Sequence, residues 1–271
     1  MNPQIIGSRD GLSRWLQTPA GIYLRDWETE QFDRVVSDIF GYHGLQLGTP
    51  EIDSLRDSRI SHCWVAHTHV DTAPELLKVN LYLDSVALPF ADQSLDLVVL
   101  PHALELSSDP HATLREVERV LVPEGRVVIS GFNPLSLWGQ SQRRAHWYAR
   151  LGIKRFFLPQ QVDFIGYWRL RDWLRLLSFE VAGGRFGCYR PAVESPAWLS
   201  RFAWMDKAGD RWWPILGAVY FLVAVKRVRG MRLMGPVWKH AKKRAVNAIP
   251  TVNSGRSNSN KSIPALGGEE P

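Results

Sequence analysis

Several side chains in this sequence have the types and positions to do chemistry. His102 follows the apolar run LDLVVL, and an imidazole at the end of a buried strand can take up a proton near neutral pH. His67, His69 and Asp71 form an HxHxD pattern after the apolar run HCWVA. Two imidazoles and a carboxylate at this spacing can hold zinc and activate water. The sequence therefore has candidate residues both for proton transfer and for metal binding.

The HxHxD pattern has a plainer alternative. In metallo-β-lactamase-like hydrolases, whose metal site opens with this form, the motif continues with a histidine, but this chain has Thr72 there. The sequence downstream also lacks further ligands at the spacing of that family. We therefore expect a solvated loop here and no bound metal.

The elements that position these residues follow an α/β pattern. Residues 95–100 (LDLVVL) and 126–132 (RVVISGF) are short, unbroken apolar runs, typical of strands covered on both faces. A helix is predicted between them, with Asp109 as its N-cap and with Pro123 and Gly125 at its end. Its apolar face comprises Leu114, Val117, Val120 and Leu121. A strand, a helix and a strand in one sheet imply a right-handed crossover and parallel pairing.

This region resembles a known family. Residues 88–99 (LPFADQSLDLVV) and 109–130 (DPHATLREVERVLVPEGRVVIS) are similar to the second half of the class I S-adenosylmethionine-dependent methyltransferases of the type 11 family. Their usual form is LPF-x-D-x-SFD-x-V, followed by a helix ending in RVLKPGG. The resemblance implies an α/β, Rossmann-like fold: a mainly parallel seven-stranded sheet with a C-terminal antiparallel hairpin strand and helices on both faces. It also implies S-adenosylmethionine as cofactor.

The resemblance further implies roles for residues near the strand ends. Asp84 stands where the family has the Asp that hydrogen-bonds the adenine amino group, and Ser85 and Val86 stand where residues flank the ring. The chemistry agrees, because an amine donates hydrogen bonds and a carboxylate only accepts them. Asp96 stands where the family holds the start of strand 4, so we expect a structural role for it. We expect packing roles for Leu88, Pro89 and Phe90.

The chain departs from the family after its first predicted strand, residues 44–48 (GLQLG). Gln46 stands where the family has an acid, and Pro50 and Ile52 stand near the positions of further glycines. Of the three glycines only Gly48 remains. These glycines let the backbone approach the methionine end of the cofactor.

A helix is predicted directly after this turn, because Thr49 can cap it and Pro50 suits its first position. Glu51 in the first turn would favour the ammonium group of methionine over its carboxylate.

The second predicted strand, residues 62–66 (HCWVA), ends about twenty residues after Gly48, where a Rossmann-like fold places an acid on the ribose hydroxyls. That acid is missing. His67 or Asp71 could accept a hydroxyl hydrogen bond instead, or both could belong to a plain surface loop. The predicted cofactor-binding residues are Gly48, Thr49, His67, Asp84, Ser85, Val86 and Pro101.

Methyl transfer is an in-line displacement at a sulfonium carbon, so the protein mainly has to align two partners and, where needed, remove a proton. A base should lie at the carboxyl end of strand 4, which is where Pro101 and His102 stand. We predict His102 as the catalytic base, and the alternative is a loop histidine that only hydrogen-bonds the turn.

Further elements complete the family order. A helix is predicted over residues 27–40, ended by Gly41, and Trp15 and Tyr23 ahead of it could reach the pocket or pack. A helix with Leu170, Trp173, Leu174 and Leu177 on its apolar face precedes strands at residues 179–182 and 219–225.

Residues 133–168 are predicted to form a lid over the substrate, because they are aromatic and basic and leave the sheet at its carboxyl edge. The candidates for substrate contact are Asn133, Trp138, Arg143, Arg144, His146 and Trp147. A covering helix that packs its aromatic residues inward explains Trp138 and Trp147 equally well.

The net charge of +6 is unevenly distributed. Residues 211–271 hold 11 Lys and Arg against 2 Asp and Glu, so the basic excess lies in the C-terminal segment, which argues against a nucleic-acid substrate. We predict a methyltransferase-like domain over residues 1–230 and a basic tail over 231–271, disordered beyond about 247. The tail could bind an anionic partner (RNA, a membrane surface or an acidic protein) or be solvated.

The composition suits one enzyme-sized domain, with 45% hydrophobic residues. The two cysteines, Cys63 and Cys188, make no disulfide framework, and the N-terminus lacks the pattern of a secretory leader. The longest apolar run, residues 212–225, is too short for a membrane span. We therefore expect a cytoplasmic protein.

Two functions remain open from the sequence. The first is transfer of a methyl group from S-adenosylmethionine to a small-molecule acceptor, which Asp84 and His102 favour. The second is a catalytically inactive methyltransferase fold that binds a partner through its lid or tail, which Gln46, Pro50 and the missing ribose acid favour.

Overall fold

A computed structural model describes residues 11–67, 79–149, 157–158, 163–193 and 195–227. The chain divides into two compact units, residues 1–229 and 230–271, and all described residues lie in the first. The predicted tail therefore lies outside the described residues.

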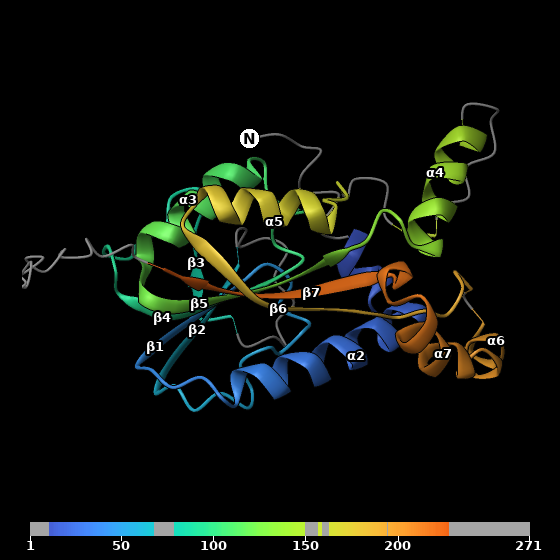
Figure 1. Cartoon of the computed structure of the whole chain (residues 1–271), viewed down its shortest axis with the longest axis horizontal. Helices are drawn as coiled ribbons and strands as arrows, with labels where there is room; N and C mark the ends of the chain where they lie inside the picture. The colour runs from blue at the N-terminus through green and yellow to red at the C-terminus, as the bar shows by residue number, and fades with distance from the viewer. Residues whose placement is uncertain (1–10, 68–78, 150–156, 159–162, 194, 228–271) are drawn as a thin grey trace, which may run out of the picture. The chain divides into compact units, whose positions relative to one another are not determined.

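The centre of the fold is a seven-stranded sheet in the order β3-β2-β1-β4-β5-β7-β6 (Figure 1). The first five strands pair in parallel, and β7 runs antiparallel to both β5 and β6. The expected mixed sheet with its C-terminal antiparallel hairpin is therefore confirmed. The strands are β1 (His43–Leu47), β2 (His62–His67), β3 (Leu81–Tyr82), β4 (Leu95–Pro101), β5 (Leu121–Phe132), β6 (Phe179–Gly187) and β7 (Val219–Lys226).

Helices cover both faces of the sheet. Figure 1 shows α3 and α5 over one face, α2 over the other, and α4, α6 and α7 beyond one end of the strands. The helices are α2 (Pro19–Val36), α3 (Pro110–Val120), α4 (Leu137–Ala149), α5 (Tyr167–Leu176), α6 (Pro196–Arg201) and α7 (Trp204–Trp212), with the 3-10 turn η1 (Pro214–Leu216) after α7. A helical segment over residues 11–15 precedes α2.

Alternate side chains of β4 enter two separate cores. Val98 and Leu100 pack with the α3 and α5 side, whereas Leu97 and Val99 pack with Phe32 of α2 and its neighbours. All four strand side chains are fully buried. This explains why β4 reads as one unbroken apolar run rather than as alternating residues.

Both ends of α3 are fixed by side chains. Asp109 accepts a hydrogen bond from the backbone N–H of Ala112, which confirms the predicted cap. The helix ends at Val120, earlier than predicted, because the chain turns extended at Leu121 and enters β5 there. The buried ammonium of Lys226 in β7 donates to two backbone carbonyl oxygens at this end, those of Glu118 and Leu121.

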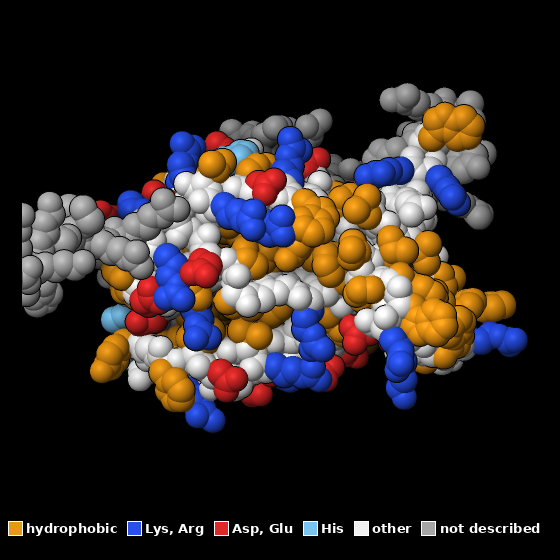
Figure 2. Space-filling view, in the orientation of Figure 1, with side chains coloured by type: hydrophobic (Ala, Val, Ile, Leu, Met, Phe, Trp, Pro, Cys, Tyr) orange, Lys and Arg blue, Asp and Glu red, His pale blue; other side chains and the backbone are white. Residues whose placement is uncertain are grey.

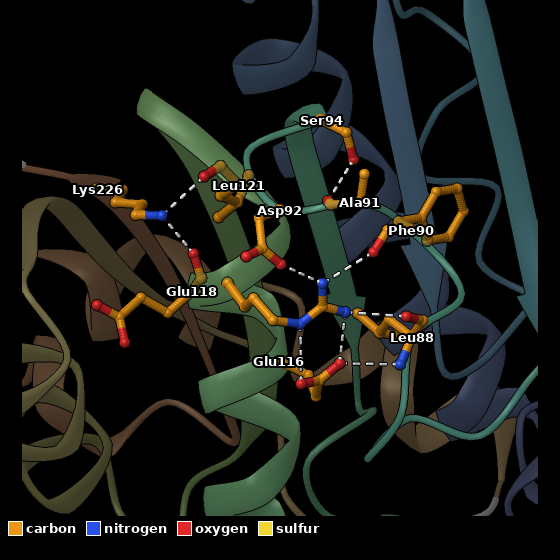
Figure 3. Close-up of polar contacts among 10 residues, drawn as sticks. Leu88, Phe90, Ala91, Asp92, Ser94, Glu116, Glu118, Leu121 and Lys226 are labelled. Atoms are coloured by element: carbon orange, nitrogen blue, oxygen red, sulfur yellow. Dashed lines mark hydrogen bonds and ion pairs between the residues drawn. The ribbon is translucent and has the colours of Figure 1, made fainter.

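The LPF segment before β4 is held to α3 by Arg119. Its guanidinium donates to the carbonyl oxygens of Leu88 (3.0 Å) and Phe90 (2.9 Å), and to the carboxylates of Asp92 and Glu116 (Figure 3). Glu116 in turn accepts from the backbone N–H of Leu88. The motif that carries the family resemblance is therefore a polar clamp between a loop and a helix.

Asp96 has the structural role expected of it. Its carboxylate accepts from the backbone N–H groups of Tyr42 (2.7 Å) and His43 (2.9 Å), and so fixes the start of β1 beside the start of β4. The packing role expected of Leu88 and Phe90 is also confirmed, since Leu88 is buried and Phe90 lies against Trp64. Pro89 is exposed.

Two helix predictions were wrong. No helix follows β1, because residues 50–57 form turns that Gln46 holds through three hydrogen bonds. The helix predicted over residues 27–40 begins at Pro19, where Thr18 caps it, and ends at Val36 before Gly41 is reached.

Replacing Arg119 with Gln should destabilise the protein by about 1 to 3 kcal/mol, because two loop carbonyls and two carboxylates lose a charged donor. Urea unfolding measures this loss. Arg115→Gln is the matched control, since Arg115 is an exposed residue of the same helix and should change the free energy of unfolding by less than about 0.5 kcal/mol. Equal losses in the two variants would contradict the clamp.

Candidate functional site

The carboxyl ends of β1 and β4 meet closely at Gly48. Its φ is +112°, and a Cβ there would lie 2.4 Å from the carbonyl oxygen of Pro101, so only glycine fits. That same carbonyl oxygen accepts from the backbone N–H of Thr49 at 3.1 Å. Strand order reverses between β1 and β4, and ligands in open α/β sheets bind outside the strand ends at such a point.

A small cavity of about 10 Å³ lies beside this junction. A space of this size accommodates about one water molecule. The cavity brings together three of the predicted cofactor residues, Gly48, Thr49 and His67, with the helical segment 11–15 on its other side. It is lined by Leu12, Ser13, Gly48, Thr49, Pro50, Glu51, His67 and Leu106.

Three buried polar atoms at this cavity have no hydrogen-bond partner. They are both carboxylate oxygens of Glu51 and the hydroxyl oxygen of Thr49. A buried carboxylate without a partner is costly, and a cation with N–H donors would remove that cost. The junction therefore suits a small ammonium group.

Gln46 explains why this loop tolerates a departure from the family pattern. Its amide nitrogen donates to the carbonyl oxygens of Thr49 (3.2 Å) and Ile52 (2.7 Å), and its amide oxygen accepts from the backbone N–H of Ser54 (3.0 Å). A carboxylate at this position could make only the last of these bonds, because it donates none. Gln46 thus stabilises the turn that replaces a helix.

The residues predicted to surround adenine form a separate turn after β3. Asp84 is exposed, and its Oδ1 accepts from the backbone N–H of Val86 at 3.2 Å. Ser85 is buried, and its hydroxyl lies 3.3 Å from the hydroxyl of Thr113 on α3. The turn presents a carboxylate to solvent beside the strand end, and the proposed contact with adenine stays a prediction.

His102, the predicted base, lies in a fully buried cluster of three titratable groups. Its Nδ1 is 2.8 Å from Oε2 of Glu105, and its Nε2 is 3.1 Å from Oε1 of Glu28 on α2. The other oxygen of Glu105 accepts from the backbone N–H of Phe132 at the end of β5. His102 itself has a φ of +51°.

The cluster holds the imidazole in its charged form. Burial lowers the pKa of His102, but the charge of Glu28 and the hydrogen bond to Glu105 outweigh it and raise the pKa to about 10. Burial raises the pKa of Glu105 in turn. A charged ring that faces two carboxylates has no lone pair free to accept a proton, so this geometry favours a positioning role. Catalysis by His102 stays a prediction.

Sequence reasoning missed Glu28 and Glu105 as partners of His102, whereas it singled out Glu51 as an acid that favours the ammonium group of methionine. Glu105 follows His102 by three residues, a spacing that could have suggested a contact. Glu28 comes from α2, and only the three-dimensional fold brings it to the end of β4.

The predicted lid residues divide between packing and exposure. Trp138 is buried and its indole N–H donates to the carbonyl oxygen of Arg190, while Asn133 binds the backbone near η1. Trp147 is exposed, as are Arg143 and Arg144, and the side chain of His146 is outside the described residues. Trp15 packs against Trp138 and Phe132 in the core.

The zinc alternative gains no support within the described part of the chain. No group of three or more His, Cys, Asp or Glu there could hold a metal ion. His69 and Asp71 lie outside the described residues.

A larger cavity of about 670 Å³ lies between α2 and α6. Its walls combine apolar side chains with the acids Asp26, Glu30 and Asp206. Asp206 accepts from the hydroxyl of Tyr23 and from the guanidinium of Arg190. The cavity is lined by Pro19, Ile22, Tyr23, Asp26, Trp27, Glu30, Arg190, Pro196, Leu199, Ser200 and Asp206.

Comparison with known proteins agrees with this architecture. Residues 59–129 match the family profile described as a methyltransferase domain. This part of the chain is therefore similar to the type 11 methyltransferase family. A chain in the solved complex of the Haloferax volcanii Trm112 methyltransferase activator with a methyltransferase shares the fold, with a TM-score of 0.53 and 19% identity over 82% of this chain and 99% of that one.

Two relatives are similar in sequence to this chain. The uncharacterized protein YafS of Escherichia coli (strain K12) is 33% identical over 62% of this chain and 65% of its own length. The malonyl-[acyl-carrier protein] O-methyltransferase of Halorhodospira halophila is 38% identical over 24% of this chain and 25% of its own length. The matches thus span less than two thirds of each relative.

S-adenosylmethionine is the cofactor of this family, and the residues present fit its ends. The unpartnered Glu51 carboxylate and Thr49 hydroxyl suit the ammonium of its methionine portion. The exposed Asp84 carboxylate suits an adenine amine. The cavity at Gly48 has to widen before the cofactor enters, because its volume of about 10 Å³ has room for about one water molecule.

The described helices include none that is long and apolar enough to cross a bilayer.

The stability of this protein should fall as the pH rises from about 6.5, the usual pKa of histidine, to the folded pKa of His102 near 10. The sign follows because the folded state binds the proton more tightly than the unfolded state does. Urea unfolding across this pH range measures the effect. His102→Asn, which tolerates a positive φ, should flatten the curve, and His111→Asn, at an exposed histidine, should leave it unchanged.

Proposed function

We propose that this protein transfers a methyl group from S-adenosylmethionine to a small, partly apolar acceptor. The observation that carries the proposal is the unpartnered Glu51 carboxylate beside Gly48 at the junction of β1 and β4. A soluble domain gains nothing from such a charge unless a cation binds there. The junction is also where the strand order of this fold reverses.

Each part of the cofactor has residues that would hold it. Gly48, Thr49 and Glu51 hold the methionine portion, and the backbone of Pro101 keeps Gly48 close to β4. His67 lies at the end of β2, where a ribose hydroxyl would find a partner. Asp84, Ser85 and Val86 form the adenine turn.

The cofactor supplies an electrophilic methyl group on a sulfonium centre. The chain then has only to orient the acceptor, exclude water and fix the end of β4. The buried cluster of Glu28, His102 and Glu105 does the last of these, because it ties β4 to α2 and β5. An acceptor whose nucleophile is already deprotonated needs no base.

The cavity between α2 and α6 supports a small acceptor. Its volume of about 670 Å³ lies within the roughly 300 to 1,000 Å³ of small-molecule sites. Apolar walls with a few acids suit a partly apolar molecule. Tyr23 lies against Trp138, and Trp138 lies against Trp15, so this aromatic cluster stands between the cavity and the helical segment 11–15. Access from the cavity to the junction requires the cluster to shift.

The alternative is a protein that keeps the fold and binds a partner without catalysis. The small volume at Gly48 and the turn held by Gln46 favour it. The two functions differ in one measurable property, which is cofactor affinity.

Calorimetric titration with S-adenosylmethionine, and separately with S-adenosylhomocysteine, tests the proposal. Asp84→Ala should weaken binding at least about tenfold, which is about 1.4 kcal/mol. Asp172→Ala, at an exposed acid on α5, is the control and should bind as the wild type does. A folded sample that binds neither compound at millimolar concentration would overturn the proposal and favour the partner-binding alternative.

Glu51→Gln should separate stability from function. It removes a buried, unpartnered charge, so the free protein should gain about 1 to 3 kcal/mol in free energy of unfolding. The same change should weaken cofactor binding, because the ammonium loses its counter-charge. Urea unfolding and calorimetry on one preparation give both quantities. A destabilised variant with unchanged affinity would show that Glu51 is structural only.

A further inference from the structure

The connection between β6 and β7 carries a dense group of exposed apolar side chains. Trp204 and Trp212 of α7 are 60% and 75% exposed, and Trp198 of α6 is 52% exposed. Single exposed apolar residues are ordinary, but a contiguous group of this size marks an interaction surface. We call this group the tryptophan patch; it comprises Trp198, Trp204, Trp212, Trp213, Ile215 and Leu216.

The spacing of the residues along α7 places two of these tryptophans on the same exposed face of the helix. Trp204, Ala208 and Trp212 are spaced at i, i+4 and i+8, so they share one face of α7. Trp198 stacks on Phe202 with an interplanar angle of 21°. Figure 2 shows hydrophobic side chains gathered over α6 and α7, with Lys and Arg projecting around them.

The opposite face of this connection is firmly packed, so the patch sits on a fixed support. A Cβ at Gly209 would lie 2.2 Å from the ring of Tyr189, which shows how closely α7 lies on the chain after β6. Leu199 is buried in the core beside α2. The Asp206 carboxylate, bound to Tyr23 and Arg190, fixes α7 to α2. The tryptophans are thus exposed on a helix whose position is fixed by packing and hydrogen bonds on its other face.

The charges beside the patch are mainly positive. Arg201, Lys207 and Arg211 are exposed among the tryptophans, and Arg201 lies over the ring of Trp198 at 5.7 Å. Among the described residues of α6 and α7, the acids are Asp210, which is exposed, and Asp206, which Arg190 already pairs, while Glu194 ahead of α6 lies outside the described residues. Tryptophan with lysine and arginine is the composition of segments that lie at the interface between lipid headgroups and acyl chains.

We propose that the tryptophan patch binds the surface of a membrane that contains anionic lipids. The indole rings enter the headgroup region, and Arg201, Lys207 and Arg211 remain at the level of the lipid phosphates. α7 is a single short helix, so it lies on the bilayer and does not span it. This inference is independent of methyl transfer, because it uses no residue of the cofactor site.

The patch and the acceptor cavity share a helix. Pro196, Leu199 and Ser200 of α6 line that cavity, and Trp198 of the same helix belongs to the patch.

Cosedimentation with vesicles tests the proposal on the full chain. The wild type should pellet with vesicles of equal parts phosphatidylglycerol and phosphatidylcholine, and much less with phosphatidylcholine alone. The double variant Trp204→Gln with Trp212→Gln should bind at least about tenfold more weakly, as should Lys207→Glu with Arg211→Glu. Trp168→Gln, at a tryptophan of α5 that is 47% exposed, is the matched control and should pellet as the wild type does.

Three results would overturn the proposal. The first is a wild type that stays in the supernatant with both kinds of vesicle. The second is a Trp204/Trp212 variant that pellets fully, because binding would then come from the basic tail. The third is a wild type that elutes as a dimer while the same variant elutes as a monomer, since the patch would then join two copies. Urea midpoints equal to that of the wild type establish that each variant is folded.

Discussion

A protonated imidazole between two buried carboxylates is the interaction on which the carboxyl end of the sheet depends. His102 follows the end of β4, Glu28 belongs to α2, and Glu105 binds the last backbone N–H of β5, so one cluster joins the ends of two strands to the helix on one face of the sheet. Removing one member of such a cluster leaves the others charged and unpaired, which commonly costs about 3 to 5 kcal/mol. The positive φ of His102 directs the ring into this position. The strand end therefore has little freedom to move.

The neighbouring junction of β1 and β4 contains a charged group that has no partner. There the backbone is fixed by Gly48 and by the amide of Gln46, while the Glu51 carboxylate has no partner. At one strand end the charged groups thus lie within ion-pair distance of one another, whereas at the other the Glu51 carboxylate has no partner and lies beside a cavity. Such an imbalance is typical of a place where a protein gives up stability for binding. The unpartnered carboxylate lies at the point where the strand order of the sheet reverses.

Much of the fold could be predicted from the sequence, because local rules decided it. Unbroken apolar runs predicted the central strands, and Asp109 predicted the start of α3. The turn after β1 could not be predicted, since Thr49, Pro50 and Glu51 favour a helix locally and Gln46 overrides them through contacts several residues away. In the candidate site, Gly48, Thr49 and His67 do line one cavity, but the partners of His102 come from distant elements that no sequence pattern connects.

The tryptophan patch lies in the connection between β6 and β7, and β6 is the outermost strand of the sheet. Insertions and substitutions there disturb neither the parallel strands nor the Gly48 junction. Substitutions at the exposed tryptophans can therefore change which surface the domain binds without changing the junction of β1 and β4. Membrane binding and cofactor binding therefore depend on separate parts of the fold.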